Sequence, residues 1–241
     1  MNLPVLSGVI RRRILVNYQA DPEVVQKLLP NGLRPKLHKA RAIVGICLIR
    51  LEQVRPKGMP HFIGLNSENA AHRIAVEWDT ETGIKEAVYI PRRDTNSWLN
   101  QNLGGRVFPA ELHAADFRVE DNQQQICLEI ESKDKVVEVH VRGQTAKALP
   151  TNSIFACLEE ASNYFKAGSL GYSASRDSSH LDGVQLQTSG WQVEPLEIEE
   201  LSSSYFANTN SFPSGSVTLD HALIMRNVEH EWFSTKPYQI V

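Results

Sequence analysis

The chain has 241 residues, of which 41% are hydrophobic and 22% charged, and its formal net charge is −3. A chain of this size can bury a substantial core, and its longest basic run, Arg11-Arg12-Arg13, is too short to mark a nucleic-acid surface. The apolar runs, such as residues 42–49, fall short of the ~20 residues that a membrane-spanning helix needs. The composition therefore predicts a single domain over residues 1–241 that has neither a nucleic-acid partner nor a membrane partner.

Several signals bear on the cellular location and on cofactors. The N-terminus lacks the basic start and the cleavage site of a secretory signal, which predicts a cytoplasmic protein. Cys47, Cys127 and Cys157 are odd in number and lie in apolar patterns, so we expect reduced core cysteines. His230-Glu231 begins like a zinc-binding HExxH motif, but Ser234 replaces the second histidine. The sequence therefore predicts no metal. No phosphate-binding loop follows a strand, so it predicts no cofactor either.

The first half of the chain reads mainly as strands. Residues 14–18 predict a strand, and Asp21-Pro22 predicts the start of a short helix that ends by residues 29–32. Residues 42–51 are apolar at both alternating sets of positions, as in a strand buried on two faces. Residues 72–78 and 85–90 flank a turn composition at 79–83 and predict a hairpin. A short helix is expected over residues 96–103.

The second half predicts an antiparallel meander followed by one long helix. Strands are expected over residues 112–119, 125–131 and 136–142. Ile154, Leu158, Ala161 and Phe165 form the apolar stripe of a helix that would start after residues 151–153. Residues 168–183 read as a polar loop able to cover a site, and strands resume at 184–188, 191–198, 201–206 and 219–225. The whole pattern predicts a mainly β (α+β) fold of curved antiparallel sheets closed into a barrel, with about three helices.

Three series of motifs follow one another along the chain. The first combines the basic start at residues 11–13, Tyr18 and Asp21, and the stop Leu29-Pro30. The second combines Asn66-Ser67-Glu68, the strand 89–94 and the segment 105–112. In order and approximate spacing these two series resemble the acetoacetate decarboxylase superfamily. The third series comprises Ile90-Pro91-Arg92-Arg93-Asp94-Thr95, Gly168 with Gly171-Tyr172-Ser173, Asp220 with Ala222 and Met225-Arg226, and His230 with Trp232. Through it the chain is more similar still to the DUF2071 branch of that superfamily.

The resemblance implies a fold and also a missing nucleophile. In the decarboxylases the first of two adjacent lysines forms an imine with the keto acid, and the second lysine lowers its pKa. Ala110 and Glu111 stand at those positions here. Alanine has no nucleophile, so the imine mechanism is not expected unless another lysine, such as Lys85 or Lys147, reaches the site, and no motif places either one there.

The resemblance also implies the site residues. Arg11 aligns with an arginine that holds the substrate carboxylate, and Arg93 is a further candidate for substrate binding. Glu68 aligns with a pocket glutamate, and with Glu111 it would supply acid/base catalysis. Each residue has a plainer alternative. Arg11 could lie on a solvated face, Glu68 and Glu111 could be turn residues, and Arg93 could pair with Asp94 or Glu86.

These observations predict a protein with the acetoacetate decarboxylase-like fold that binds a small organic anion, a keto or hydroxy acid, and assembles as a homo-oligomer. It would act as a lyase or hydratase by acid/base chemistry without an imine. The alternative is a non-catalytic ligand-binding or assembly module on the same barrel.

Overall fold

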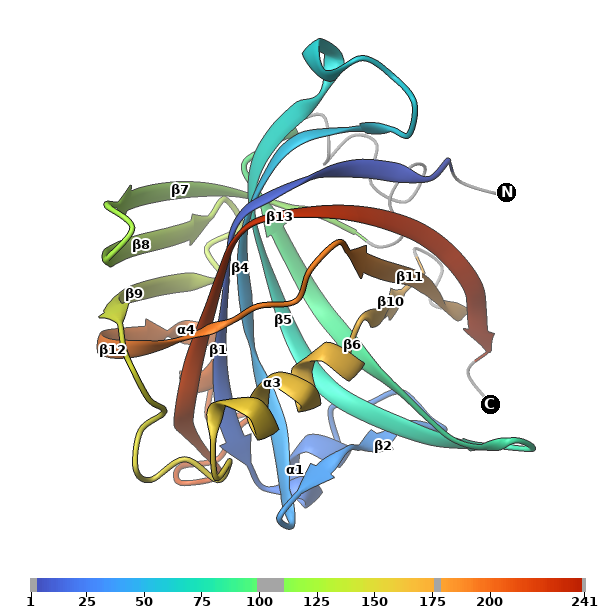
Figure 1. The fold of residues 1–241 in the computed structure, drawn as a ribbon. Coiled ribbons are helices and arrows are strands. Elements are labelled where there is room, and N and C mark those ends of the chain that lie inside the picture. Colours follow the sequence, from blue (N-terminus) through green and yellow to red (C-terminus); the bar gives the residue numbers. More distant parts are fainter. Residues whose placement is uncertain (1–3, 99–110, 176–178, 240–241) are drawn as a thin grey trace.

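Long strands dominate the architecture. The computed structural model describes residues 4–98, 111–175 and 179–239 (Figure 1). Five long strands run through the molecule: β1 (Leu6–Ala20), β4 (Arg41–Pro56), β5 (Leu65–Thr80), β6 (Gly83–Thr95) and β13 (Val217–Gln239). The shorter strands are β2 (Arg34–Pro35), β3 (Leu37–His38), β7 (His113–Asp121), β8 (Gln125–Ser132), β9 (Glu138–Thr145), β10 (Leu170–Ala174), β11 (His180–Thr188) and β12 (Glu194–Ser203). The described helices are α1 (Pro22–Gln26), α3 (Leu158–Ala167), α4 (Ser204–Ala207) and the 3-10 turn η1 (His61–Ile63).

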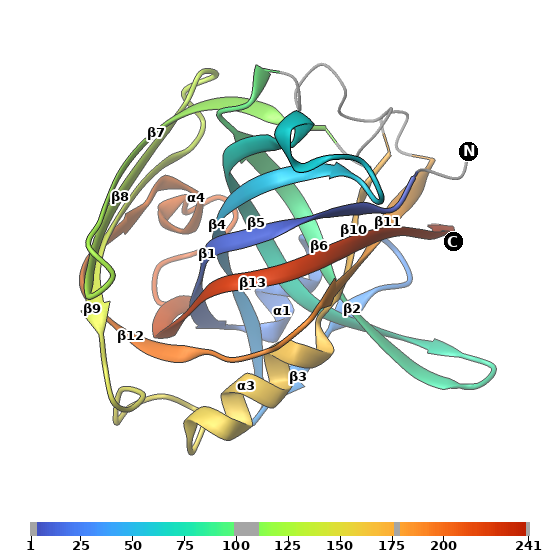
Figure 2. The same ribbon diagram turned by 45° about the horizontal axis from the view of Figure 1, so that its top comes forward.

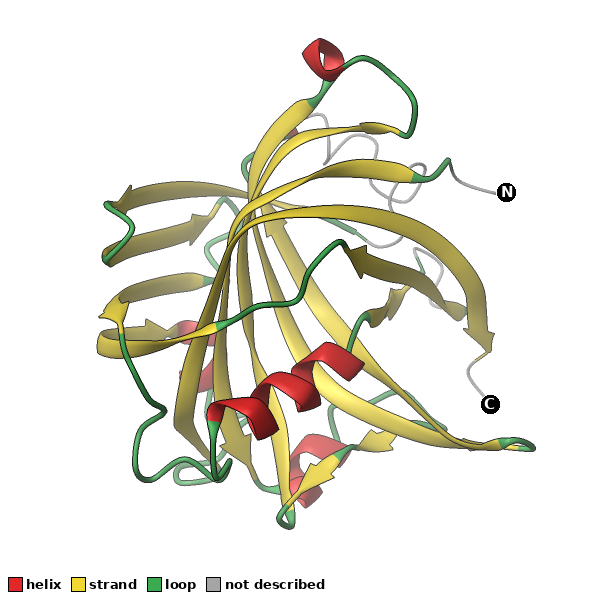
Figure 3. Cartoon of the chain, viewed as in Figure 1, coloured by secondary structure: helices red, strands yellow, loops and turns green. Residues whose placement is uncertain are grey.

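The strands form one curved sheet whose pairings close on themselves. One circuit runs β6–β7–β8–β9–β12–β13–β1–β4–β5 and returns to β6. A second runs β6–β10–β11–β13–β1–β4–β5, so the two circuits share the five long strands (Figures 2 and 3). The predicted mainly β fold of curved sheets is confirmed. The sheet is mixed, because β10 pairs with β6 and β6 pairs with β7 in parallel.

The shared strands are buried on both faces, and a separate core lies against each face. One face packs against β7–β9, β12 and α4, with Ile126, Leu128 and Val141 in the cluster. The other face packs against α3 and the segment before it, through Phe155 and Phe165. This two-sided burial accounts for the continuous apolar sequence of β4, which pairs with β1 on one side and β5 on the other.

The predicted capping of the first helix is confirmed, because the Asp21 side chain accepts a hydrogen bond from the backbone N–H of Glu23 at 2.9 Å. The predicted hairpin and meander correspond to β5–β6 and to β7–β8–β9. No described helix is long and apolar enough to cross a bilayer.

Several predicted segments differ in the structure. The strands predicted over 191–198 and 201–206 form one strand, β12, which ends at Ser203 and is followed by α4. The long helix begins at Leu158 and not after residues 151–153, because the Asp220 carboxylate accepts hydrogen bonds from Ser153 Oγ at 2.8 Å and Ile154 N at 2.9 Å and holds that segment in turns. The polar stretch 168–183 is not all loop, since it contains β10 and the start of β11. Most of the helix predicted over 96–103 lies outside the described residues.

We expect His72 to make the stability of the fold depend on pH. Its ring is buried and stacks on Tyr205 with centroids 4.1 Å apart, and neither ring nitrogen has a hydrogen-bond partner in the described part of the chain. Burial, aided by the charge of Arg92, lowers the pKa of His72 to about 3. The unfolded chain therefore binds this proton more tightly than the folded protein does.

The stabilisation linked to neutral His72 is fully present above pH ~6.5 and is lost as pH falls toward about 3. We expect the free energy of unfolding, measured by urea titration, to fall over this window. His72→Phe keeps the aromatic stacking and removes this titration, so it should reduce the slope to what other groups contribute, among them His230, whose pKa burial lowers to about 4. An unchanged slope in His72→Phe would assign the pH dependence to other groups.

Candidate functional site

A cavity of about 150 Å³ lies on the side of the sheet that α3 covers. Its walls are mostly apolar, with Leu15, Ile49, Leu51, Val88, Ile90, Phe165, Val184, Leu186 and Trp232 among the lining residues. The polar side chains that line it are Arg13, Cys47, Asn69, Arg73, Arg93 and Ser169. No aspartate, glutamate or lysine is among the described residues of the lining.

Strand register brings the polar residues together. Cys47 on β4 lies opposite Ala71 on β5, and Ala71 lies opposite Arg93 on β6. Side chains along such a row share one face of the sheet, and the small methyl group of Ala71 leaves space between the thiol and the guanidinium. Asn69, Ala71 and Arg73 alternate along β5 on this same face.

Three arginines reach the cavity, each with a neutral partner. Arg13 Nε donates to Cys47 Sγ at 3.3 Å, Arg93 Nε donates to Ser173 Oγ at 3.2 Å, and Arg73 Nη2 donates to Asn17 Oδ1. Arg73 Nε is buried and has no partner in the part of the chain that the structure describes. Within the same residues none of the three arginines forms an ion pair with a carboxylate, in contrast to Arg12 and Arg92, which do.

Burial is the main electrostatic influence on two of these arginines. It lowers the pKa of Arg73 and of Arg93 to about 10 each, while the nearby Cys47 acts in the raising direction on both. Both guanidinium groups remain cationic at neutral pH. The cavity thus combines desolvated positive charge with apolar walls. This combination favours a ligand that has an anionic group and a small apolar part.

A buried chain of hydrogen bonds orients Arg73. Asn17 Nδ2 contacts His221 Nε2 at 3.0 Å, and His221 Nδ1 contacts Asp220 Oδ2 at 2.5 Å. If Nδ1 carries the proton toward Asp220, Nε2 accepts from the amide, and the amide oxygen of Asn17 is left to accept from Arg73. Asn17, Asp220 and His221 are all buried. This chain of hydrogen bonds fixes the orientation of the Asn17 amide group.

Gly45 makes room for this arrangement. It lies opposite Asn17 on β1 and opposite Arg73 on β5. A Cβ atom at Gly45 would lie 2.4 Å from the Val16 carbonyl oxygen and 3.4 Å from Asn17 Oδ1. The absent side chain therefore lets Arg73 reach Asn17 across the strand between them.

Gly45→Ala is accordingly expected to destabilise the protein by about 1–3 kcal/mol, because the new methyl group forces the packed β1 and β4 backbones apart. It should also weaken anion binding by displacing Arg73. Chemical denaturation and ligand titration measure the two effects. Gly190→Ala is a control for the loss of a glycine, since a Cβ there would meet nothing within 4 Å and the residue has no positive φ.

The structure brings one of the four predicted site residues into this cavity. Arg93 lines it, whereas Arg11, Glu68 and Glu111 are not among the lining residues. Glu111 is exposed, next to Leu112, which does line the cavity. Ala110 lies outside the described residues. Arg92, and not Arg93, pairs with Asp94, at 2.7 Å.

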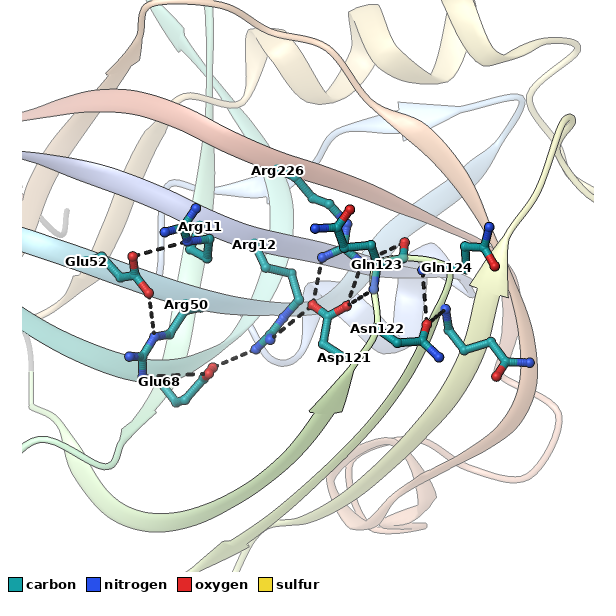
Figure 4. A network of polar contacts seen from close by, with 11 residues as sticks. Arg11, Arg12, Arg50, Glu52, Glu68, Asp121, Asn122, Gln123, Gln124 and Arg226 are labelled. Carbon is teal, nitrogen blue, oxygen red and sulfur yellow. Dashed lines mark hydrogen bonds and ion pairs between the residues drawn. The ribbon is translucent and has the colours of Figure 1, made fainter.

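Glu68 belongs to a buried ion-pair network on the other face of β5 (Figure 4). Arg12 Nη2 donates to Glu68 Oε2 at 2.7 Å, and Arg50 Nη1 lies 3.9 Å from Oε1. Arg12 also approaches Asp121 at 3.6 Å, and Asp121 pairs with Arg226. Burial raises the pKa of Glu68, although Arg12 and Arg50 pull it the other way.

A bulge separates Arg11 from Arg13. Simple alternation predicts one shared face for the two, but the register of β1 against β4 shifts between Ile10 and Arg12, where Arg11 is skipped. Arg11 is exposed and binds Glu52 Oε2 at 3.1 Å and Asn227 Oδ1 at 2.8 Å. Arg13 lies on the cavity side, 5.7 Å from the Trp191 ring centroid.

Sequence reasoning missed Arg73 and Cys47 as site residues. The available signal was the alternation of residues 72–78, which sets Arg73 on the face opposite His72 and Ile74. A buried arginine in the middle of a strand needs a partner, and the nearest carboxylate on that strand face, Glu77, is four residues away and pairs with Arg34. No group of histidine, cysteine, aspartate or glutamate side chains is arranged as metal ligands in residues 4–98, 111–175 and 179–239.

Comparison with known proteins agrees with this architecture. The DUF2071 family, described as an uncharacterized conserved protein, matches residues 9–228, and the chain belongs to this family. No curated protein matches the chain.

Solved structures show which fold this is. An acetoacetate decarboxylase from Legionella pneumophila has a TM-score of 0.59 at 10% identity over 98% of this chain and 88% of its own. A second acetoacetate decarboxylase structure has a TM-score of 0.61 at 12% identity, over 99% and 91% of the two chains. The enduracididine biosynthesis enzyme MppR, complexed with pyruvate, has a TM-score of 0.58 at 10% identity over 98% and 90%. The chain therefore has the acetoacetate decarboxylase-like fold.

Proposed function

We propose that this protein binds a short organic carboxylate, a keto or hydroxy acid, in the cavity lined by Arg13, Arg73 and Arg93. The observation that carries the proposal is the gathering of three arginines without a carboxylate partner among the described residues. Burying positive charge without a counter-charge costs free energy. A bound anion would supply the missing negative charge, and guanidinium groups match a planar carboxylate well.

The size and polarity of the cavity support a small ligand. A cavity of about 150 Å³ accommodates a molecule of about six heavy atoms. Pyruvate and lactate are of this size, and MppR, which shares the fold, has been solved with pyruvate. The apolar walls formed by Ile49, Val88 and Phe165 suit a short aliphatic remainder.

We prefer carboxylate binding to acid/base catalysis as the proposed function. A lyase or hydratase step by Glu68 or Glu111 requires one of these carboxylates to reach the ligand. Glu68 is held by Arg12 on the other sheet face, and Glu111 is exposed. Their catalytic role stays a prediction, tested by assaying wild type, Glu68→Gln and Glu111→Gln for turnover of the same acids. The predicted homo-oligomer is tested by light scattering.

The proposal is tested by matched pairs of ligands that differ only in charge. Pyruvate and lactate are compared with pyruvamide and lactamide in a thermal-shift titration. We expect the carboxylates to raise the melting temperature, by about 2–4 °C for each kcal/mol of linked binding free energy, and the amides to leave it unchanged. Equal shifts for acids and amides, or no shift with any short carboxylate, would overturn the proposal.

A further inference from the structure

We propose that Cys47 is a nucleophile of this cavity, and that its thiol adds reversibly to the carbonyl carbon of a bound short keto acid. The inference rests on the proposed carboxylate binding and deepens it, since it names the ligand class and the atom that reacts. The nucleophile would then come from β4, in the middle of the shared strands, and not from the segment around Ala110.

The position of the thiol is the first observation. Cys47 is a free cysteine, 7% exposed, and it lines the cavity. Arg13 Nε donates to its sulfur at 3.3 Å. Ala71 lies between Cys47 and Arg93 in the cross-strand row, so no bulky side chain separates the thiol from that arginine.

The second observation points independently to a ligand beside the thiol. Arg73 is about nine-tenths buried, lines the same cavity, and its Nε–H has no acceptor in the described part of the chain. Cys47, Arg73 and Arg93 line the same cavity, and Arg73 lies opposite Gly45, two residues from Cys47 along β4. A carboxylate bound by these two arginines would therefore present its adjacent carbon to the sulfur.

The chemistry of the step is balanced within the site. The sulfur forms a bond to the carbonyl carbon as the carbon–oxygen π bond breaks, and the thiol proton passes to the carbonyl oxygen. The product is a hemithioketal, so no oxidant, reductant or leaving group is needed. Arg13 Nε–H contacts the sulfur in this structure, so it would be close to the carbonyl oxygen that gains negative charge during the addition.

Site-resolved alkylation tests the reactivity and its charge preference. Iodoacetate carries a carboxylate and iodoacetamide is its neutral match. We expect iodoacetate to modify Cys47 about 10-fold faster than iodoacetamide does, because the arginines attract the carboxylate. The exposed Cys157 serves as the internal control without this preference. Arg73→Met should remove the preference at Cys47, and an unchanged preference in that variant would contradict the proposal.

A direct observation of the adduct completes the test, and it does not depend on access for an alkylating reagent. Pyruvate labelled with ¹³C at the carbonyl carbon should give a protein-bound tetrahedral-carbon NMR signal with wild type and with Cys157→Ser, but not with Cys47→Ser. Identical spectra for wild type and Cys47→Ser would overturn the inference.

Lactate separates the two proposals, since it has the carboxylate and no carbonyl to attack. If lactate stabilises both wild type and Cys47→Ser but pyruvate forms no Cys47-dependent adduct, only the nucleophile is refuted. If lactate stabilises neither protein, carboxylate binding itself fails.

Discussion

Arg73→Met is expected to weaken binding of a short carboxylate roughly 10- to 100-fold. Methionine is also unbranched but lacks the charge, so the variant removes a charge-assisted contact of about 1.5–3 kcal/mol without opening a large void. The free protein should change little in stability, because the lost bond to Asn17 is offset by removal of a buried charge that has no carboxylate partner among the described residues. Calorimetric titration with lactate measures the effect on affinity.

Arg11→Met is the matched comparison for this experiment. Arg11 is exposed and pairs with Glu52 and Asn227 outside the cavity. We expect its replacement to leave the dissociation constant within about twofold of wild type. A large loss in Arg11→Met, together with unchanged binding in Arg73→Met, would restore the role that the family resemblance gives to Arg11 and refute the cavity assignment.

The two experiments depend on a difference in electrostatic environment between the two faces of the shared strands. On one face, Arg12 and Glu68 neutralise one another within a buried network. On the other, Arg13 and Arg73 are left with neutral partners. Adjacent residues of one strand thus have opposite electrostatic roles because side chains alternate across the sheet. Charge matched inside the protein stabilises the fold, whereas the unmatched charge in the cavity is the charge that we propose a carboxylate ligand neutralises.

The sequence predicts the fold class because its signals are local. Alternation, turn composition and the Asp21 cap identify most strands and α1 without knowledge of their partners. Where contacts between residues distant in the sequence determine the local structure, the sequence pattern does not predict it. Asp220 binds Ser153 and Ile154 from 66 or 67 residues away and delays the start of α3, and the polar strand β10 forms because β6 and β11 pair with it.

The candidate site was harder to predict than the fold for the same reason. Arg93 follows from a motif and lies in the cavity. Arg11 follows from the same kind of alignment, but a one-residue bulge in β1 against β4 turns it outward. Arg73 and Cys47 become recognisable only once the register places them around Ala71, and no single-sequence pattern fixes that register.

Glu68→Ala is expected to lower the free energy of unfolding by about 3–5 kcal/mol, which corresponds to a drop in melting temperature of roughly 10 °C. The reason is Arg12, whose side chain is 4% exposed and would be left with the more distant Asp121 as its remaining anion. The control is Glu52→Ala, which breaks pairs with Arg11, a side chain that is 57% exposed, and with Arg50, which is 29% exposed, and it should cost less than about 1 kcal/mol.

A double variant separates a structural role of Glu68 from the predicted catalytic one. Replacing Arg12 and Glu68 together by leucine removes both charges, so it should recover much of the stability lost in Glu68→Ala. Asp121 keeps its pairing with Arg226 in that variant, which limits the new imbalance. If Glu68→Ala instead unfolds like wild type while turnover of a keto acid disappears, Glu68 acts in catalysis. The buried pair would then contribute little to holding the shared strands together.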